Sequence, residues 1–154
     1  MSDWSIRPVQ ESDQDEVARM MALLWTDATR EEHREELEGP LRAGISGTLP
    51  VAILVADIGA GRLIGFIEVG LRSHADGCDT ARPVGFIEGW FVDEEFRNRG
   101  VGRELVRTAE DWARSQDCTE MASDTWIDNE GSQTAHLALG YEIVDRCVHF
   151  RKSI

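Results

Sequence analysis

The chain has 154 residues, 42% of them hydrophobic, and carries a formal net charge of −13 with a sequence pI near 4.6. This length predicts one globular domain over residues 1–154, with a proper core. The acidic balance argues against nucleic acid as a partner, because phosphates are neutralised by basic faces. It is compatible with a polycationic substrate drawn in by the field of the protein, and equally with an acidic surface that only maintains solubility.

The sequence gives no sign of a membrane segment, a signal peptide or a metal site. Its longest apolar stretch, Val51–Ala56, is too short to cross a membrane. The first residues lack the basic start and apolar core of a signal peptide. The three cysteines, Cys78, Cys118 and Cys147, are scattered and form no metal-binding spacing. We therefore expect no membrane association, no metal and a reducing, cytoplasmic setting.

The first third of the chain predicts a strand and two helices. The strand covers Ser5–Val9. A helix capped by Ser12 and closed by Trp25 follows, and a second, charge-rich helix begins after Thr29 and runs to about Arg42. The first helix has apolar residues at helical spacing, namely Val17, Met20, Met21 and Leu24.

The middle of the chain predicts three strands. Val51–Asp57 and Leu63–Leu71 flank the turn Gly59–Gly61 and form a hairpin. A polar loop, Ser73–Pro83, separates the hairpin from a third strand, Val84–Val92.

The last third predicts a helix over Arg103–Ala113, a strand over Glu120–Asp124 and a helix over Asn129–Leu139. A final pair of strands is expected at Tyr141–Val144 and Cys147–Arg151. This order of elements predicts an α/β protein with a mixed sheet flanked by helices.

A glycine-rich turn lies between the strand ending at Val92 and the following helix. Such a turn directs several backbone N–H groups at one spot, where the positive end of the helix dipole adds to them, so it predicts a phosphate cradle. It lacks the spacing of a nucleotide P-loop and that of a dinucleotide-binding turn. A turn that merely starts a helix is the other interpretation. The segment reads Arg97-Asn98-Arg99-Gly100-Val101-Gly102 and is followed by Arg103.

This R-x-x-G-x-G pattern resembles the acetyl-CoA pyrophosphate loop of the GCN5-related N-acetyltransferases (GNAT). The order of elements resembles their fold, with a central mixed, mostly antiparallel sheet in a single domain. Five short phrases resemble one branch, the aminoglycoside 6′-N-acetyltransferases. They are Leu24-Trp25, Pro83-Val84-Gly85-Phe86-Ile87-Glu88-Gly89, Glu120-Met121-Ala122-Ser123-Asp124, Asp128-Asn129 and Leu139-Gly140-Tyr141-Glu142.

The resemblance implies acetyl-CoA as cosubstrate. The Val92 N–H is the expected donor to the thioester oxygen as that oxygen gains charge. Asn129 would hydrogen-bond the coenzyme arm, or it could equally be a plain helix cap. The implied cofactor-binding residues are Trp90, Phe91, Val92, Arg97, Asn98, Arg99, Gly100, Val101, Gly102, Arg103 and Asn129.

The resemblance also implies an acidic site for an amino sugar. Glu88 interrupts an apolar strand, and Asp124 ends a strand where a cleft should open, so both are candidates for binding the ammonium group and taking its proton. Glu88 could instead be a hydrogen-bonded edge residue, and Asp124 a turn residue. Asp145 is a third candidate or a hairpin-turn residue, and Trp25 lines the sugar site or packs in the core.

The implied reaction is direct transfer of acetyl to the 6′-amine of an aminoglycoside antibiotic in a ternary complex. Cys118 is expected to be inert, and no covalent nucleophile is expected in the site. His136 stands where many relatives carry a tyrosine that reprotonates the thiolate, so His136 or water is the expected donor. The alternatives are acetylation of another cationic amine, such as a polyamine or a protein N-terminus, and a non-catalytic acyl-CoA sensor. A homodimer is expected from the resemblance.

Overall fold

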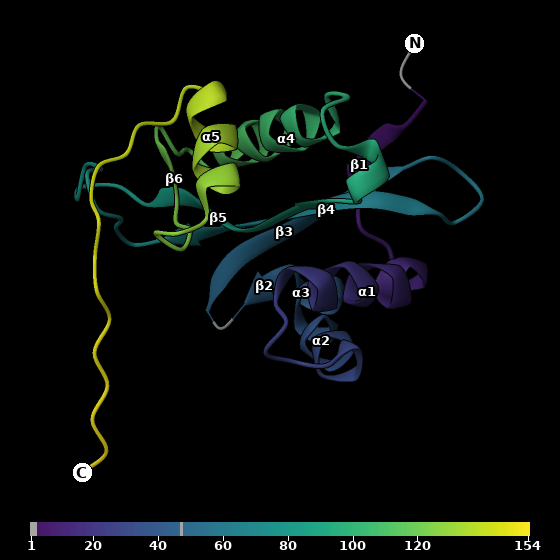
Figure 1. Cartoon of the computed structure of the whole chain (residues 1–154), viewed down its shortest axis with the longest axis horizontal. Helices are drawn as coiled ribbons and strands as arrows, with labels where there is room; N and C mark the ends of the chain where they lie inside the picture. Colours follow the sequence, from purple (N-terminus) through teal and green to yellow (C-terminus); the bar gives the residue numbers. More distant parts are fainter. Residues whose placement is uncertain (1–2, 47) are drawn as a thin grey trace.

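The fold is a six-stranded sheet with helices on both faces, seen in a computed structural model that describes residues 3–46 and 48–154 (Figure 1). The strands are β1 (Ser5–Pro8), β2 (Ile45–Ser46), β3 (Leu49–Asp57), β4 (Leu63–Arg72), β5 (Val84–Val92) and β6 (Met121–Ser123). The α-helices are α1 (Gln14–Leu24), α2 (Arg30–Glu36), α3 (Glu38–Ala43), α4 (Val101–Ser115) and α5 (Glu130–Ala138). Short 3-10 turns cover Glu11–Asp13 and Glu94–Phe96.

The sheet is mixed and mostly antiparallel, as the sequence predicts. Its strand order is β1-β3-β4-β5-β6, with β2 pairing to β3, and among the described strands only β5 and β6 run parallel. That parallel pairing is short and ends where Ile87 faces Ser123, while β5 continues to Val92 without β6 beside it. We call this point of separation the fork.

Two apolar cores lie on opposite faces of the sheet. In Figure 1, α1, α2 and α3 lie on one side of the strands and α4 and α5 on the other. One core buries Leu105 and Ala109 of α4 against Ile67 of β4. The other buries Met20 of α1 against Phe66 of β4. Within the described residues, no helix is long and apolar enough to cross a membrane.

The prediction of one helix from Thr29 to about Arg42 is wrong at its centre. Thr29 caps α2 as expected, because its side chain accepts the Glu32 N–H in a capping box. The helix then breaks at Leu37 into α2 and α3. Pro40 explains the break, because a proline has no N–H for the carbonyl four residues before it.

The expected cap of the first helix is also wrong. Ser12 lies inside the 3-10 turn that precedes α1 and caps nothing. The side chain that closes this turn is Asp13, which accepts the Gln10 N–H at 2.8 Å. Asp13 is buried and paired with Arg7 at 2.7 Å, and this ion pair holds the pKa of the Asp13 carboxyl below its usual value.

The two strands predicted after α5 are absent from residues 141–151, which the structure describes throughout. Residues 141–154 form no regular element, and the chain leaves the body of the protein as an extended tail (Figure 1). Large apolar side chains on this tail are exposed, and Phe150 is 94% accessible. The alternation that predicts strands is present in the sequence, but the tail pairs with no strand among the described residues.

Candidate active site

The glycine-rich turn opens α4 as predicted. Gly100 has a left-handed backbone with φ of 97°, and Asn98 is left-handed at φ of 59°. Beyond Gly100 and its immediate neighbours along the chain, no described atom lies within 4 Å of the place that a Cβ on Gly100 would take. The N-cap residue of the 15-residue α4 is Gly100, which has no side chain to accept hydrogen bonds from the first N–H groups of the helix. These donors and the positive end of the helix dipole are therefore available to a bound anion. Arg99 and Arg103 are exposed beside it.

Arg97 lies differently from its neighbours in the turn. Its Nε donates to the Val92 carbonyl at 2.9 Å, and the residue lines an open hollow of about 1070 Å³ together with Glu16 and Arg19 of α1. Arg97 thus stabilises the end of β5 through its hydrogen bond to Val92. The guanidinium groups beside the turn that could contact a phosphate are then those of Arg99 and Arg103.

Trp90 links the end of β5 to the cradle. A Cβ on Gly102 would come within 2.9 Å of the Trp90 ring, so the indole lies against the first turn of α4. Its Nε1–H is buried and has no hydrogen-bond partner among the described residues. Such an orphaned donor is costly in a folded protein, and a ligand acceptor would satisfy it. A polar, phosphate-bearing cosubstrate such as acetyl-CoA therefore fits the residues present here.

The backbone of Val92 faces the gap beside β5. The Asp93 N–H donates to the Ile64 carbonyl at 2.9 Å, and Val92 is opposite Gly65 in the register of β4 and β5. Hydrogen-bonding alternates along an antiparallel pair, so the N–H and C=O of Val92 point away from β4. The Val92 carbonyl accepts a hydrogen bond from Arg97 Nε. The Val92 N–H is therefore directed away from β4, and its oxyanion role stays a prediction.

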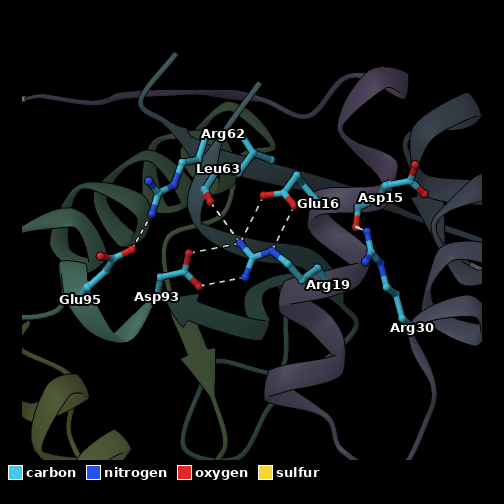
Figure 2. A network of polar contacts seen from close by, with 8 residues as sticks. All are labelled: Asp15, Glu16, Arg19, Arg30, Arg62, Leu63, Asp93 and Glu95. Atoms are coloured by element: carbon cyan, nitrogen blue, oxygen red, sulfur yellow. Dashed lines mark hydrogen bonds and ion pairs between the residues drawn. The ribbon is translucent and has the colours of Figure 1, made fainter. Parts of the chain in front are cut away.

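A network of ion pairs anchors this end of β5 to α1 (Figure 2). Arg19 contacts both carboxylate oxygens of Asp93 at 3.2 Å, the Glu16 carboxylate at 3.1 Å and the Leu63 carbonyl at 3.3 Å. Because Asp93 follows Val92 directly, these contacts fix the strand end that carries the Val92 N–H.

An acidic pocket of about 580 Å³ lies on the α1 and α2 face of the sheet. Among its lining residues are Trp25, His33 and four carboxylates, Asp27, Glu36, Glu68 and Glu88. None of the described residues that line it carries an ammonium or guanidinium group. This charge distribution favours a ligand with several positive charges.

Trp25 forms a wall of this pocket through a close contact. A Cβ on Gly89 would fall 2.5 Å from two ring carbons of Trp25, so only glycine leaves room for the indole on β5. The ring also meets Phe66 edge-on at 6.1 Å. The buried His33 holds the end of α1, because its Nε2 lies 3.0 Å from the Trp25 carbonyl.

Glu88 is at the pocket but already has a cation beside it. The Arg72 guanidinium donates to both of its carboxylate oxygens, at 3.0 and 2.8 Å, and lies 3.5 Å from the centre of the Phe86 ring. The hydrogen bonds from Glu88 are the main cause of the raised pKa of Arg72, and the charge of Asp124, which is exposed just beyond the fork, adds to it. Arg72 thus contacts Glu88 and is influenced by the charge of Asp124.

Glu68 is a pocket residue that the sequence analysis missed. It lies on β4 opposite Gly89, at a bulge in the pairing with β5, and has no hydrogen-bond or ion-pair partner in the part of the chain that the structure describes. Burial, together with the negative charges of Glu88 and Glu36, raises the pKa of its carboxyl to about 7. The signal was present: Glu68 interrupts an apolar run just as Glu88 does.

Two predicted residues lie apart from this pocket. Asn129 accepts the Ser132 N–H at 3.1 Å and thus caps α5, which is the plainer of its two interpretations. Asp145 is exposed on the tail, and its carboxylate accepts the neighbouring Arg146 N–H. The structure does not bring Asp145 to the pocket of its own chain.

His136 lies at the fork. Its Nε2 is 2.9 Å from Ser123 Oγ, and its Nδ1 is 2.7 Å from the Ser132 carbonyl oxygen. The imidazole packs edge-on against Trp90 and Tyr141. Cys118 is buried, and burial raises the pKa of its thiol, so it is a poor nucleophile.

Comparison with known proteins gives consistent matches along the chain. The model of the acetyltransferase (GNAT) family matches residues 17–141. The aminoglycoside N(6′)-acetyltransferase type 1 of Klebsiella aerogenes is 40% identical over 149 residues, which cover 97% of this chain and 96% of the relative. The enzyme of the same name from Stenotrophomonas maltophilia is 36% identical and covers 96% and 92%.

Solved structures agree with these relatives. AAC(6′)-Iy in complex with the bisubstrate analog CoA-S-monomethyl-acetylneamine superposes with a TM-score of 0.87 at 33% identity, covering 99% of this chain and all of the other. The aminoglycoside 6′-N-acetyltransferase AAC(6′)-Ih from Acinetobacter baumannii superposes with a TM-score of 0.85 at 32% identity, covering 98% and 99%.

Proposed function

Because the chain belongs to the acetyltransferase (GNAT) family, we propose that it transfers acetyl from acetyl-CoA to the 6′-amine of aminoglycoside antibiotics and thereby confers resistance. The observation that carries this proposal is the acidic pocket, which four carboxylates line on the face of β4 and β5 opposite α4. Relatives named for the same activity match nearly the whole chain. We propose that residues 1–154 work as one domain.

The acyl donor is held on the other side of the fork. The N-terminus of α4 with Asn98, Arg99 and Arg103 receives the pyrophosphate, and the unpartnered Nε1–H of Trp90 offers a donor to the pantetheine arm. Acetyl-CoA supplies an activated acetyl thioester. The Val92 N–H stabilises the oxygen of that group as it becomes negative, a contribution on the order of 3 kcal/mol in comparable sites.

The acidic pocket prepares the amine. An aminoglycoside enters as a polycation and is held by Glu68, Glu88 and Asp124, with Trp25 against a sugar ring. The reacting ammonium must lose a proton before its lone pair can attack. Glu68, with its pKa near 7, and the solvent-facing Asp124 are the groups placed to take that proton. Attack by the bound amine on the thioester makes this a ternary-complex reaction without an acyl-enzyme.

We also propose that the protein acts as a homodimer in which the tail of each chain pairs with the other copy. Val144, Val148, Phe150 and Ile154 are exposed on this tail, at 60–115% accessibility. An extended segment with unpaired backbone groups is a template for strand pairing, and exposed apolar side chains favour burial. In the proposed dimer, Asp145 on the paired tail would approach the acidic pocket of the second copy. It does not reach the acidic pocket of its own chain.

A cytoplasmic location is part of the proposal. The donor is a product of central metabolism, and all three cysteines are unpaired, as expected in a reducing compartment.

The decisive experiment is thiol release from acetyl-CoA with kanamycin, a 6′-hydroxyl aminoglycoside and spermidine in parallel. Turnover with kanamycin and little with the hydroxyl analogue establishes transfer to the 6′-amine. Turnover with spermidine alone keeps the fold and the acyl donor but assigns the pocket to polyamines. Binding of acetyl-CoA without thiol release in any arm would overturn the enzymatic proposal.

A further inference from the structure

A buried histidine connects two parts of the wall of the acidic pocket. The imidazole of His33, on α2, has Nε2 3.0 Å from the Trp25 carbonyl oxygen and Nδ1 3.2 Å from a carboxylate oxygen of Glu36. All three residues line the pocket. The imidazole therefore joins the residue that ends α1 to one of the four carboxylates of the pocket.

The two contacts of the imidazole differ in what they require. A carbonyl oxygen only accepts, so Nε2 carries a proton whether the ring is neutral or charged. In the neutral ring Nδ1 then has only a lone pair, which faces the ionised Glu36 carboxylate, another acceptor. A hydrogen bond from Nδ1 to Glu36 forms only when the ring takes a second proton. His33 and Glu36 are thus an ion pair when the imidazole is charged and two separate groups when it is neutral.

The charged groups around His33 come from several elements. Those of its own helix and of the pocket are all acidic, namely Glu32 and Glu36 of α2, Asp27 of the loop before α2, Glu68 of β4 and Glu88 of β5. The cations of α2, Arg30 and Arg34, donate instead to the carbonyl and the carboxylate of Asp15 on α1. Among the described side chains, only that of His33 lies within ion-pair distance of Glu36 and can be its cation.

Exposure decides which member of the pair a ligand can reach. The Glu36 side chain is 70% exposed, whereas that of His33 is 4% exposed. A substrate ammonium can therefore contact the carboxylate from solvent but cannot contact the imidazole. The ammonium and the charged imidazole compete for one carboxylate.

We propose that His33 is a positioning residue for aminoglycoside binding, which pairs with Glu36 when its ring is charged and leaves Glu36 to a substrate ammonium when its ring is neutral. The inference rests on the proposed function, which assigns the acidic pocket to aminoglycosides. Binding of an ammonium at Glu36 releases the Nδ1 proton of His33 to solvent, while the bond from Nε2 to Trp25 is kept. The wall formed by Trp25 stays in place as the charge of the pocket changes.

The first test measures the KM for kanamycin at about pH 5.5 and about pH 8, on either side of the pH of about 6.5 at which an ordinary imidazole changes charge. His33→Gln cannot become charged, and its amide N–H can still donate to Trp25. At the lower pH its KM should be about two- to fivefold below that of the wild type, as for one exposed ion pair. At the higher pH the two KM values should agree within about twofold, and kcat should be similar at both. Glu68 titrates in the same range, so the proteins are compared at one pH.

Glu36 supplies the second half of this test. In a Glu36→Gln background, His33→Gln should no longer change the KM, because the carboxylate for which the two cations compete is gone. Glu35→Gln removes the same charge from the neighbouring exposed position of α2 and should leave the effect of His33→Gln intact. Thermal unfolding checks the fold of every variant. A folded His33→Gln with the wild-type KM at about pH 5.5, or an effect that persists without Glu36, would overturn the proposal.

Nitrogen-15 NMR of the imidazole needs neither cosubstrate nor a His33 variant. At about pH 5.5, where an ordinary imidazole is charged, we expect two ring N–H signals for His33. The Nδ1–H signal should move in Glu36→Gln and on addition of kanamycin to the wild type, and should stay in place in Glu35→Gln. In the neutral ring the remaining proton should be on Nε2. A neutral ring protonated on Nδ1, or an Nδ1–H signal that is the same in Glu36→Gln as in the wild type, contradicts the proposed pair.

The two proposals fail in different ways. Wild-type protein that releases no thiol with any amine overturns the proposed function, and the NMR comparison of the free wild type with Glu36→Gln then decides by itself whether His33 and Glu36 form the pair. Normal turnover of kanamycin together with an unchanged KM in His33→Gln overturns only the role of His33.

Discussion

The guanidinium of Arg72 holds both carboxylate oxygens of Glu88 at the edge of the acidic pocket. The side chain of Glu88 is 35% exposed and that of Arg72 43% exposed, so this is a solvent-facing ion pair rather than a buried one. A substrate ammonium and Arg72 therefore compete for the same carboxylate, and the apo pocket offers less free negative charge than its lining suggests.

Arg72→Gln is expected to lower the KM for kanamycin at low ionic strength. The substitution frees Glu88, and exposed ion pairs of this kind contribute about 0.3–1 kcal/mol, which corresponds to about two- to fivefold in affinity. Steady-state kinetics with saturating acetyl-CoA measures the effect. Arg114→Gln removes the same charge from α4, on the opposite side of the sheet from α1 and α2 (Figure 1), and should leave KM unchanged. A higher KM in Arg72→Gln would mean that Arg72 positions Glu88 for the substrate rather than competing with it.

Glu68→Gln is expected to change how stability depends on pH. The pKa of Glu68 is raised from 4.5 to about 7 in the folded protein. A carboxyl raised in this way contributes stability below its unfolded pKa, and the contribution is lost as pH rises through the folded value. Glutamine does not titrate, so the variant should gain on the wild type between about pH 5 and pH 8, by up to about 3 kcal/mol.

Urea unfolding near both pH values measures this gain. Glu35→Gln, on the exposed face of α2, is the matched control. If the free energy of unfolding of wild type and of Glu68→Gln varied with pH in the same way, the pKa of Glu68 would not be raised in the folded protein.

Gly89→Ala is expected to displace Trp25. The new methyl group would lie 2.5 Å from the indole carbons, so the ring must shift, and overpacking of this kind costs about 1–3 kcal/mol. The KM for the aminoglycoside should rise more than the KM for acetyl-CoA, because Trp25 lines the acidic pocket. In Gly39→Ala the added methyl group meets its nearest atom at 3.7 Å, which makes it a suitable control. Equal changes in both KM values would point to general loss of structure.

The contrast between Glu68 and Glu88 shows what the sequence could and could not reveal. Both carboxylates interrupt apolar strands, so the pattern predicts two unusual residues, but it does not say which one finds a partner. Glu88 is the carboxylate that finds a partner, Arg72. The two side chains are close together only because β4 and β5 are antiparallel neighbours. Local signals were reliable where backbone geometry decides, as at Gly100 and at the Thr29 cap.

The tail shows the opposite case. Its alternation is a genuine strand signal, but a strand requires a neighbour, and none is available in residues 3–46 or 48–154. The break at Leu37 was predictable from the sequence, because Pro40 disfavours a continuous helix through this region.

Phe150→Asp is expected to dissociate the proposed dimer. A charge at this exposed apolar position opposes its burial against a second copy. Sedimentation velocity over a range of concentrations should show a dimer for the wild type and a monomer for the variant. Lys152→Gln alters the same exposed tail without touching an apolar side chain and should remain dimeric. A wild type that stays monomeric at high concentration would exclude tail pairing.

The four carboxylates of the acidic pocket also bear on what happens after chemistry. Acetylation turns an ammonium into a neutral amide, so the inactivated antibiotic carries one positive charge fewer than the drug. Attraction to the pocket weakens by that charge, on the order of 0.2–1 kcal/mol for a contact open to solvent. The pocket therefore binds the acetylated product less tightly than the drug, and this difference in affinity favours exchange of the product for fresh drug.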